Sequence, residues 1–235
     1  MPNAAHPPAL HALIPCAGAG TRAGASGPKQ YQPVAGRALI EHTLAAWAGV
    51  TEVRSVVVVV AADDGFFAHK ALPDGRFFVA PCGGSTRATS VFNGLNWLLA
   101  HGAAAHDWVL VHDGARCLVE PRHIRALIAA CEHDEVGGLL ALPLPDTLKQ
   151  EQGGRVVATL SRADKWLAQT PQMARIGTLL QALESAGDAV TDEASALEAC
   201  GLSPRLVRGS AHNFKVTYPE DFALAEAVLQ ARVSG

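Results

Sequence analysis

The sequence has few charged and few aromatic residues for its length. Of 235 residues, 17% are charged and 6% are aromatic, whereas 49% are hydrophobic. This composition excludes an intrinsically disordered chain, which carries more charge and less apolar surface. The formal net charge is only -3, so bulk charge attracts neither nucleic acid nor an anionic membrane, and we expect no partner of either kind. Any chemistry on phosphates must therefore depend on a few well-placed cations.

Paired cysteine motifs and long apolar runs are also missing. The 5 cysteines lie far apart and form no CxxC pair, which is typical of reduced thiols rather than of a disulfide framework. The first residues contain Pro2, Pro7 and Pro8 without a long apolar run, so they do not resemble a signal peptide. The longest apolar stretch, 56–62, is too short to span a bilayer. We expect a cytoplasmic protein.

Short apolar runs alternate with amphipathic segments along the chain. The apolar runs are 10–14, 55–61, 108–112 and 139–142. Because they are continuous rather than alternating, they indicate parallel strands buried on both faces. Apolar residues at helical spacing occur at 39–47, 91–99, 124–128 and 224–229, and the four tryptophans fit apolar faces. The pattern predicts a single α/β domain over 1–235 with a Rossmann-like, doubly wound and mostly parallel sheet, in which ligands bind beyond the carboxyl ends of the strands.

The segment 143–163 interrupts this alternation. Two short β-like runs, 147–149 and 156–160, flank the pair Gly153-Gly154, which favours a turn. The segment is therefore predicted to be a β-hairpin. An isolated hairpin is only marginally stable in water, so we expect it to pack against a second subunit.

A glycine-rich loop follows the first predicted strand directly. Its residues are Pro15, Cys16, Ala17, Gly18, Ala19, Gly20, Thr21 and Arg22. Small residues allow backbone N–H groups to approach a phosphate chain, and a following cation adds positive charge. The glycines alone are equally compatible with a plain tight turn.

Two common phosphate-binding motifs do not fit this loop. A P-loop needs lysine after glycine and before serine or threonine, but Lys29 lies between Pro28 and Gln30. A dinucleotide-binding loop needs GxGxxG and an acidic residue about 20 positions later. Here the third glycine, Gly24, comes one position late, and 34–40 contains no acid. Neither a kinase nor a dehydrogenase is favoured.

The continuation Pro28-Lys29-Gln30-Tyr31 makes the loop distinctive, because Pro28 stiffens the backbone before Lys29. With Gly18-x-Gly20-x-Arg22, it resembles the loop of the 2-C-methyl-D-erythritol 4-phosphate cytidylyltransferases of the non-mevalonate isoprenoid pathway. The resemblance extends over 11–229. It continues through further motifs at 83–95, 111–116, 145–147, 169–172, 191–195 and 213–217.

The resemblance implies both a fold and a reaction. The fold is that of nucleotide-diphospho-sugar transferases. The reaction transfers CMP from CTP to a sugar-alcohol phosphate, 2-C-methyl-D-erythritol 4-phosphate, and releases pyrophosphate with the help of Mg²⁺. It also implies a homodimer in which the hairpin arm, 143–163, crosses to the neighbouring site.

Roles for individual residues follow from the same resemblance. Those implied in catalysis are Arg22, Lys29, Arg162 and Lys215. Those implied in nucleotide binding are Pro15, Ala17, Gly18, Ala19, Gly20, Thr21, Gly84, Ser85 and Ser90. Those implied in acceptor binding are Thr147, Thr170 and Arg116. Asp113, at the end of a predicted strand, is the implied metal ligand.

Each motif also has a purely structural interpretation. Gly83-Gly84 fits a strand-to-helix turn, with Ser85 or Thr86 capping the helix. Arg116 is placed to pair with Asp113, and Thr191 to cap a helix that begins at 192–193. His112 is expected to be a strand-end histidine rather than a base, because a phosphate nucleophile needs no deprotonation.

The sequence departs from the family pattern at a few positions. Cys16 replaces the usual alanine, Gly114 another alanine, and Cys117 a proline. None of these changes removes a charged group. Three alternatives stay open: a ribitol-5-phosphate cytidylyltransferase, a sugar-nucleotide synthase that uses UTP or GTP, and a non-catalytic nucleotide-binding protein. The last would be expected to lose its placed cations, which are present here.

Overall fold

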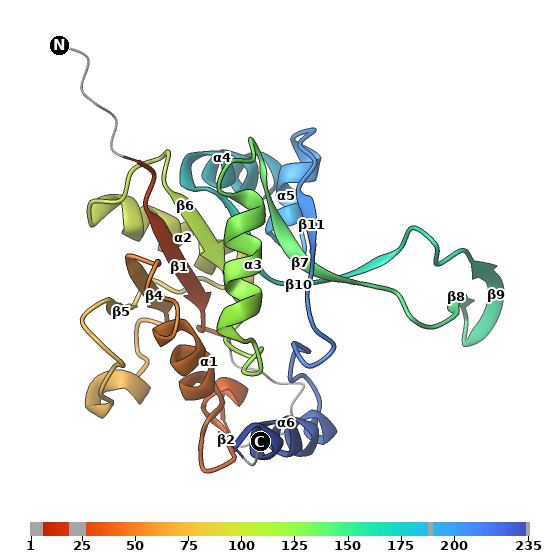
Figure 1. Cartoon of the computed structure of the whole chain (residues 1–235), viewed down its shortest axis with the longest axis horizontal. Helices are drawn as coiled ribbons and strands as arrows, with labels where there is room; N and C mark the ends of the chain where they lie inside the picture. Colours follow the sequence, from red (N-terminus) through yellow and green to blue (C-terminus); the bar gives the residue numbers. More distant parts are fainter. Residues whose placement is uncertain (1–6, 19–26, 188–189, 234–235) are drawn as a thin grey trace.

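The computed structural model of the chain describes residues 7–18, 27–187 and 190–233 (Figure 1). Seven strands form a central sheet in the spatial order β11-β7-β10-β6-β1-β4-β5. They are β1 (Leu10–Pro15), β4 (Ser55–Val59), β5 (Phe77–Ala80), β6 (Trp108–Val111), β7 (Gly137–Pro143), β10 (Trp166–Arg175) and β11 (Arg205–Arg208). Strand β10 runs antiparallel to β6 and β7, and the other pairs are parallel. The predicted mostly parallel α/β sheet is confirmed.

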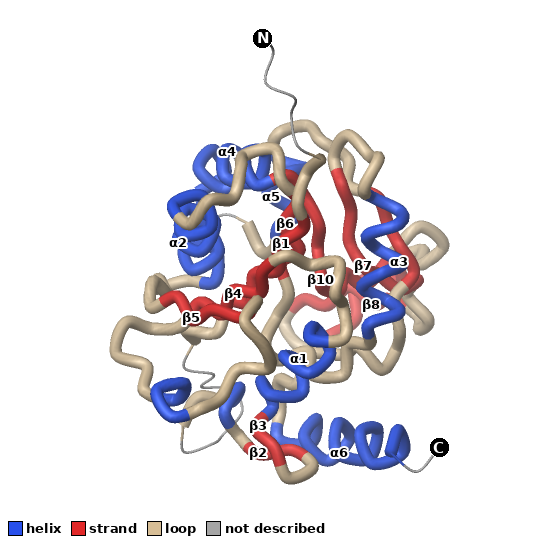
Figure 2. The backbone as a smooth tube through the Cα atoms, turned by 60° about the vertical axis from the view of Figure 1, so that its left-hand side comes forward, coloured by secondary structure: helices blue, strands red, loops and turns tan. Residues whose placement is uncertain are grey.

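Helices cover both faces of this sheet (Figure 2). They are α1 (Leu39–Ala48), α2 (Arg87–Ala100), α3 (Pro121–Cys131), α4 (Ile176–Ala186), α5 (Glu193–Ala199) and α6 (Pro219–Val233). In β1, the side chains of Ala12 and Ile14 pack with α1 and α3, whereas Leu13 packs with α2, α4 and α5. Successive side chains of a strand point to opposite faces, so a strand buried on both faces must be continuously apolar. This explains why β1, β4 and β6 were visible in the sequence.

Helix α6 belongs to a smaller apolar cluster beside the main sheet. Its Ala225 packs with Val216 and with Val34. Val34 belongs to the short strand β2 (Pro33–Val34), which pairs with β3 (Arg37–Ala38). Val216 is completely buried, and its N–H donates to the carbonyl of Ala115 at 2.9 Å. This cluster therefore fixes the segment that follows β11 against the loop after β6.

Three strands of the main sheet were not among the apolar runs predicted as strands: β5, β10 and β11. Strand β10 is the instructive case, because Gln169, Thr170 and Gln172 are polar and yet at most 5% exposed. Their side chains are hydrogen-bonded, so burial here depends on partners that an apolar pattern does not reveal.

The expectation that all four tryptophans pack on apolar faces is wrong for one of them. Trp47 and Trp108 are buried, but Trp166 is 40% exposed. It lies where β10 begins, at the base of the arm, and it pairs with Pro143 at the end of β7. At that point the two strands leave the layers of helices (Figure 1).

The predicted hairpin is present. Strands β8 (Leu148–Gln152) and β9 (Arg155–Leu160) pair antiparallel as a separate sheet, and Figure 1 shows them projecting from the body of the molecule. Gly153 and Gly154 have φ of 60° and 77°, the left-handed conformation that a two-residue hairpin turn requires. The hairpin exposes Val156, Val157 and Leu160, which are between 41% and 63% accessible.

Within the described residues, no helix combines the length and the apolar character needed to cross a membrane.

Candidate active site

A cavity of about 540 Å³ lies beyond the carboxyl ends of β1, β5 and β6, where the fold predicts a ligand. Its volume falls within the range of small-molecule sites, roughly 300 to 1,000 Å³. The predicted residues that line it are Pro15, Ala17, Gly18, Lys29, Gly84, Ser85, Ser90, Asp113 and Lys215. Cys16, Gln30, Thr86, Arg87, Gly114 and Ala115 also line it. Loops distant in sequence therefore converge on one cavity.

Gln30 holds the glycine-rich loop at the point where it leaves β1. Its side chain is buried, and Nε2 donates to the carbonyls of Cys16 at 2.8 Å and Gly18 at 3.0 Å. The next residue, Tyr31, stacks on Phe66 with ring centroids 4.0 Å apart and donates its hydroxyl to Asp64 at 2.5 Å. These contacts anchor the short helix η2 (Lys29–Tyr31). The ammonium of Lys29, at the cavity, donates to the carbonyl of Val216 at 2.8 Å.

The pair Gly83-Gly84 lies against the glycine-rich loop, and Gly84 lines the cavity. A Cβ atom added to Gly83 would lie 2.3 Å from Cβ of Ala17, so only glycine allows the two loops to approach this closely. The Gly84 N–H donates to the Ser90 hydroxyl at 3.0 Å, and that hydroxyl donates to the carbonyl of Thr86 at 2.9 Å. The Thr86 hydroxyl accepts from the Thr89 N–H, so Thr86 caps α2. The sequence had offered Ser85 or Thr86 as this cap. These hydrogen bonds fix the turn that brings Gly84 and Ser85 to the cavity.

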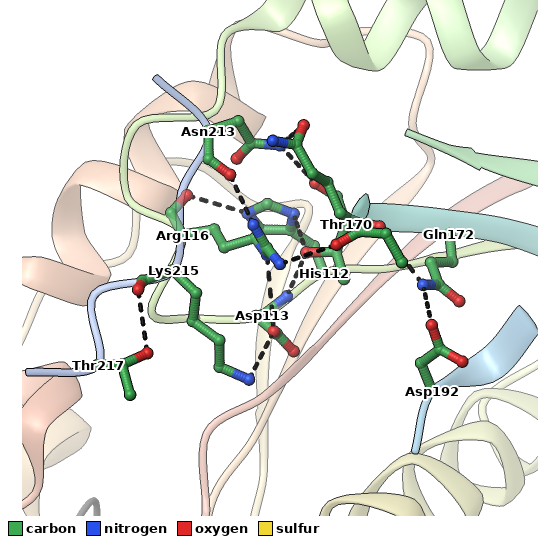
Figure 3. Close-up of polar contacts among 12 residues, drawn as sticks. His112, Asp113, Arg116, Thr170, Gln172, Asp192, Asn213, Lys215 and Thr217 are labelled. Atoms are coloured by element: carbon green, nitrogen blue, oxygen red, sulfur yellow. Dashed lines mark hydrogen bonds and ion pairs between the residues drawn. The ribbon is translucent and has the colours of Figure 1, made fainter. Parts of the chain in front are cut away.

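Asp113 lies directly after β6 and is surrounded by cations. Its Oδ1 accepts from Nε of Arg87 at 2.8 Å. Its Oδ2 accepts from Nζ of Lys215 at 2.8 Å (Figure 3). Nε of Arg116 lies 3.8 Å from Oδ2. Burial by itself raises the pKa of the Asp113 carboxyl, but Arg87 and Lys215 lower that pKa far below its usual range. The carboxylate is therefore ionised at any working pH.

Arg87 was not among the predicted site residues. Besides its bond to Asp113, its two terminal nitrogens donate to Glu193, Nη1 to Oε1 at 2.7 Å and Nη2 to Oε2 at 3.1 Å. Burial opposes the charge of Arg87, but Glu193 and Asp113 raise its pKa above the ordinary value. The signal in the sequence was a cation three residues after Gly84, directly after the predicted helix cap Ser85 or Thr86.

Two predicted acceptor-binding residues lie beneath the cavity rather than in its lining. Arg116 donates to the carbonyls of Asn213 at 2.6 Å and Ala168 at 3.3 Å, and so ties the loop after β6 to β10 and to the segment after β11. Thr170 is 4% exposed, and its hydroxyl accepts from the Asp113 N–H at 3.0 Å. Both side chains support the loop that carries Asp113.

His112 completes the support beneath Asp113. Its Nε2 lies 3.2 Å from the carbonyl of Arg116, which can only accept, so the proton resides on Nε2 and Nδ1 accepts from the Thr170 hydroxyl at 3.0 Å (Figure 3). The ring is completely buried, and this burial lowers the pKa of His112 to about 4. A neutral ring with both nitrogens bonded is structural, which agrees with the prediction that His112 is not a base.

The start of α5 differs from the prediction by one residue. Asp192, not Thr191, is the N-cap, because its Oδ1 accepts from the Ser195 N–H at 2.9 Å. Its Oδ2 accepts from Nε2 of Gln172 at 2.9 Å, and this contact attaches the helix to β10 (Figure 3).

Several predicted residues cannot be placed in this cavity. Ala19, Gly20, Thr21 and Arg22 lie outside the described residues. Thr147 and Arg162 are exposed at the two ends of the arm and do not line the cavity of their own chain.

The chemistry available at the cavity is electrostatic. Lys29, Arg87 and Lys215 line it, and Asp113 is its one acidic residue among those that the structure describes. Such a site suits a polyanion with phosphate groups. Across the described residues, no group of three or more His, Cys, Asp or Glu side chains forms a ready-made metal site.

Comparison with known proteins assigns the family. The family model of 2-C-methyl-D-erythritol 4-phosphate cytidylyltransferase matches residues 10–231. The chain is 54% identical over 227 residues to the 2-C-methyl-D-erythritol 4-phosphate cytidylyltransferase of Burkholderia cenocepacia, covering 94% of this chain and 96% of that protein. It is 67% identical over its whole length to the bifunctional enzyme IspD/IspF of Albidiferax ferrireducens, but spans only 56% of that protein.

Solved structures give the same result. A crystal structure of 4-diphosphocytidyl-2C-methyl-D-erythritol synthase matches with a TM-score of 0.84 and 38% identity, over 94% of this chain and 98% of that chain. The 2-C-methyl-D-erythritol 4-phosphate cytidylyltransferase of Thermus thermophilus matches with a TM-score of 0.75 and 31% identity, over 93% of this chain and 98% of that chain.

The buried neutral His112 predicts a loss of stability in acid. Its pKa of about 4 lies below the ordinary value of 6.5, so the folded state binds fewer protons than the unfolded state. The contribution of neutral His112 to the free energy of unfolding is fully present above pH 6.5. It is lost as the pH falls towards 4, by an amount on the order of 3 kcal/mol. Urea unfolding at several pH values measures this slope.

Substitution isolates the contribution of His112, because burial also lowers the pKa of His11 and His123. A His112→Asn variant is expected to lose less free energy of unfolding between pH 6.5 and 4 than the wild type. His133→Asn, at a side chain 93% exposed, is the control and keeps the wild-type slope. Equal slopes for wild type and His112→Asn would refute the assignment.

Proposed function

Because the chain belongs to the 2-C-methyl-D-erythritol 4-phosphate cytidylyltransferase family, we propose that it transfers CMP from CTP to the phosphate of 2-C-methyl-D-erythritol 4-phosphate. The products are the CDP-linked sugar alcohol and pyrophosphate. The reaction belongs to the synthesis of isoprenoid precursors.

The observation that carries the proposal is the convergence of three lysine and arginine side chains on one cavity between two glycine-bearing turns. Lys29, Arg87 and Lys215 reach it from the loop after β1, the start of α2 and the segment after β11. The backbone around Gly18 and Gly84 forms its walls. Glycine-bearing turns let a polyphosphate approach the backbone closely, while the cations offset its charge.

The reaction requires no general base. An oxygen of the acceptor phosphate, already anionic, attacks the α-phosphorus of CTP, and the bond from that phosphorus to the oxygen of the β-phosphate breaks. The pyrophosphate leaves with the bonding electron pair. The main barrier is the approach of one polyanion to another, so catalysis depends on positioning and charge stabilisation. Lys29, together with Arg22, stabilises the transition state and the leaving pyrophosphate, and Lys215 helps to orient the attacking phosphate.

Mg²⁺ is the cofactor we propose, with Asp113 as its protein ligand. One carboxylate fits this ion, because Mg²⁺ commonly binds to one or two carboxylates, substrate phosphates and water. Both oxygens of Asp113 are paired with cations, so Lys215 would release Oδ2 to the metal of the bound nucleotide. When bound, the ion would neutralise charge on the phosphates. The release of Lys215 would then direct its ammonium towards the acceptor phosphate.

A homodimer is proposed from the arm. It projects from the body and exposes Val156, Val157 and Leu160, and an isolated hairpin with these residues in water is only marginally stable. Thr147 and Arg162 lie at its ends, away from the cavity of their own chain. The arm would bring both residues to the neighbouring cavity, where Arg162 would orient the acceptor phosphate.

Replacement of Lys29 tests the electrostatic mechanism. In Lys29→Ala, loss of a preorganised cation is expected to raise the barrier by on the order of 3 kcal/mol, so kcat falls by about a hundredfold or more. The assay is release of pyrophosphate with CTP, Mg²⁺ and the acceptor. Lys70→Ala, at a surface lysine that pairs with Glu41, is the control and is expected to match the wild type. Full activity in Lys29→Ala would contradict the mechanism.

The same assay separates the alternative substrates. We expect turnover with 2-C-methyl-D-erythritol 4-phosphate, little with ribitol 5-phosphate, and CTP preferred over UTP and GTP. Activity with ribitol 5-phosphate alone would overturn the proposed acceptor. Nucleotide binding without turnover of any acceptor would favour a non-catalytic protein.

Mixed dimers test whether the arm serves the neighbouring site. Arg162→Ala and Lys29→Ala are each expected to be nearly inactive alone. When co-expressed, they form mixed dimers in which one cavity has an intact Lys29 and an intact Arg162 from its neighbour. Random pairing then restores up to about a quarter of the wild-type activity. If Arg162 serves the cavity of its own chain, every cavity has one defect and no activity returns.

A further inference from the structure

Glu193 is a buried carboxylate that does not line the cavity but is hydrogen-bonded to Arg87, which does. It is 2% exposed, and it accepts from both terminal nitrogens of Arg87 at 2.7 and 3.1 Å. The third nitrogen of the Arg87 guanidinium, Nε, donates to Oδ1 of Asp113 at 2.8 Å. One guanidinium therefore joins two carboxylates, one at the cavity and one behind it.

The position of Glu193 is fixed by the residues on either side of it. Gln172 of β10 donates Nε2 to Asp192 at 2.9 Å, and its Oε1 accepts from the Ala194 N–H at 2.7 Å. A single amide thus holds the residues before and after Glu193. Because the N-terminal turn of α5 cannot shift along β10 without breaking both bonds, the Glu193 side chain is held towards Arg87.

These contacts close a ring through the sheet. Gln172 pairs with Val111 in the β6–β10 ladder, and Val111 is two residues before Asp113. The ring runs from Asp113 through Arg87 and Glu193 to the start of α5, then through Gln172 back to the end of β6. A side chain held in a closed ring of charge-assisted bonds loses most of its freedom. Asp113 is consequently fixed by the Arg87–Glu193 pair as well as by its position after β6.

We propose that Glu193 is a positioning residue, which acts through Arg87 to hold the Asp113 carboxylate with its Oδ2 available to Lys215 and to the bound nucleotide's metal. This inference rests on the proposed function. Glu193 also balances the charge of Arg87. Without Glu193, Asp113 would be the only remaining carboxylate contact of Arg87 in the described network, and their attraction would strengthen.

The direction of the effect follows from this charge balance. A neutral Glu193→Gln side chain of similar shape makes the cluster more positive and tightens the Arg87–Asp113 pair. Both changes oppose a cation at Asp113 and favour an anion in the cavity. The Mg²⁺ concentration for half-maximal activity is expected to rise about tenfold or more, as is typical when a group that supports a metal ligand is lost. Binding of metal-free CTP is expected to stay as tight as in the wild type or become tighter.

The experiment compares the full-length wild type, Glu193→Gln and the matched control Glu198→Gln, which changes an exposed glutamate on the same helix. Pyrophosphate release is measured over a range of Mg²⁺ concentrations, and CTP binding is measured calorimetrically in EDTA. The proposal predicts a higher Mg²⁺ requirement in Glu193→Gln without weaker metal-free binding, and wild-type values in Glu198→Gln. An unchanged Mg²⁺ requirement, or a loss of CTP binding in EDTA, would overturn it.

A spectroscopic readout keeps this inference separate from the proposed function. In the ligand-free wild type, the Nε–H of Arg87 is expected to give a protected NMR signal, assigned by its disappearance in Arg87→Lys. In Glu193→Gln, loss of the bidentate contact is expected to shift this signal, and the tighter bond from Nε–H to Asp113 is expected to slow its exchange with water. If wild type transfers no cytidylyl group, the proposed function fails while this signal still tests the ring.

Circular dichroism shows whether Glu193→Gln folds, and Glu193→Asp provides a second variant if it does not. Glu193→Asp keeps the charge but shortens the side chain, so an intermediate Mg²⁺ requirement and an intermediate exchange rate are expected. Wild-type values of both quantities in Glu193→Asp would overturn the proposal, because the shorter side chain cannot hold Arg87 by the same two bonds.

Discussion

The site depends on one buried carboxylate and the cations gathered around it. Asp113 accepts from Arg87 and Lys215 at 2.8 Å, with Arg116 at 3.8 Å. Without Asp113, these cations would repel one another in a partly desolvated cavity. Without the cations, burial would favour the protonated carboxyl. The carboxylate and the cations therefore stabilise one another in their charged forms. Together they present net positive charge to a substrate that carries several negative charges.

The fold assembles this cluster from segments that are far apart in the sequence. Parallel strands β1, β4, β5 and β6 direct their carboxyl ends, and the loops after them, to one edge of the sheet. The antiparallel strand β10 then brings Thr170 beneath Asp113 and Gln172 against α5. The apolar cluster around Val216 places Lys215 beside the loop after β6. The antiparallel strand β10 thus supports the loop that carries Asp113, while the loops after the parallel strands line the cavity.

The sequence predicted the parts that follow from apolar patterning and from local motifs. Strands β1, β4, β6 and β7 are continuous apolar runs, and Gly153-Gly154 marks the hairpin turn, so these elements could be located within a few residues. The places of Lys29 and Asp113 after predicted strands indicated that they meet at one edge of the sheet, whereas Lys215 was assigned to the site through the family resemblance alone. Strand β10 was missed because its buried side chains are polar, and polar burial depends on partners that only the folded chain supplies. Arg87 and Glu193 were missed for the same reason, since neither residue type in isolation indicates a paired, buried charge.

Charge balance around Asp113 is the central claim, and binding of CTP without metal tests it most directly. Calorimetric titration in EDTA compares the wild type with Asp113→Asn, which removes the negative charge and keeps the shape of the side chain. If Asp113 is the counter-ion that holds Arg87 and Lys215, the variant binds metal-free CTP more tightly than the wild type, although its turnover with Mg²⁺ falls. Weaker or unchanged binding of metal-free CTP by Asp113→Asn would contradict the account.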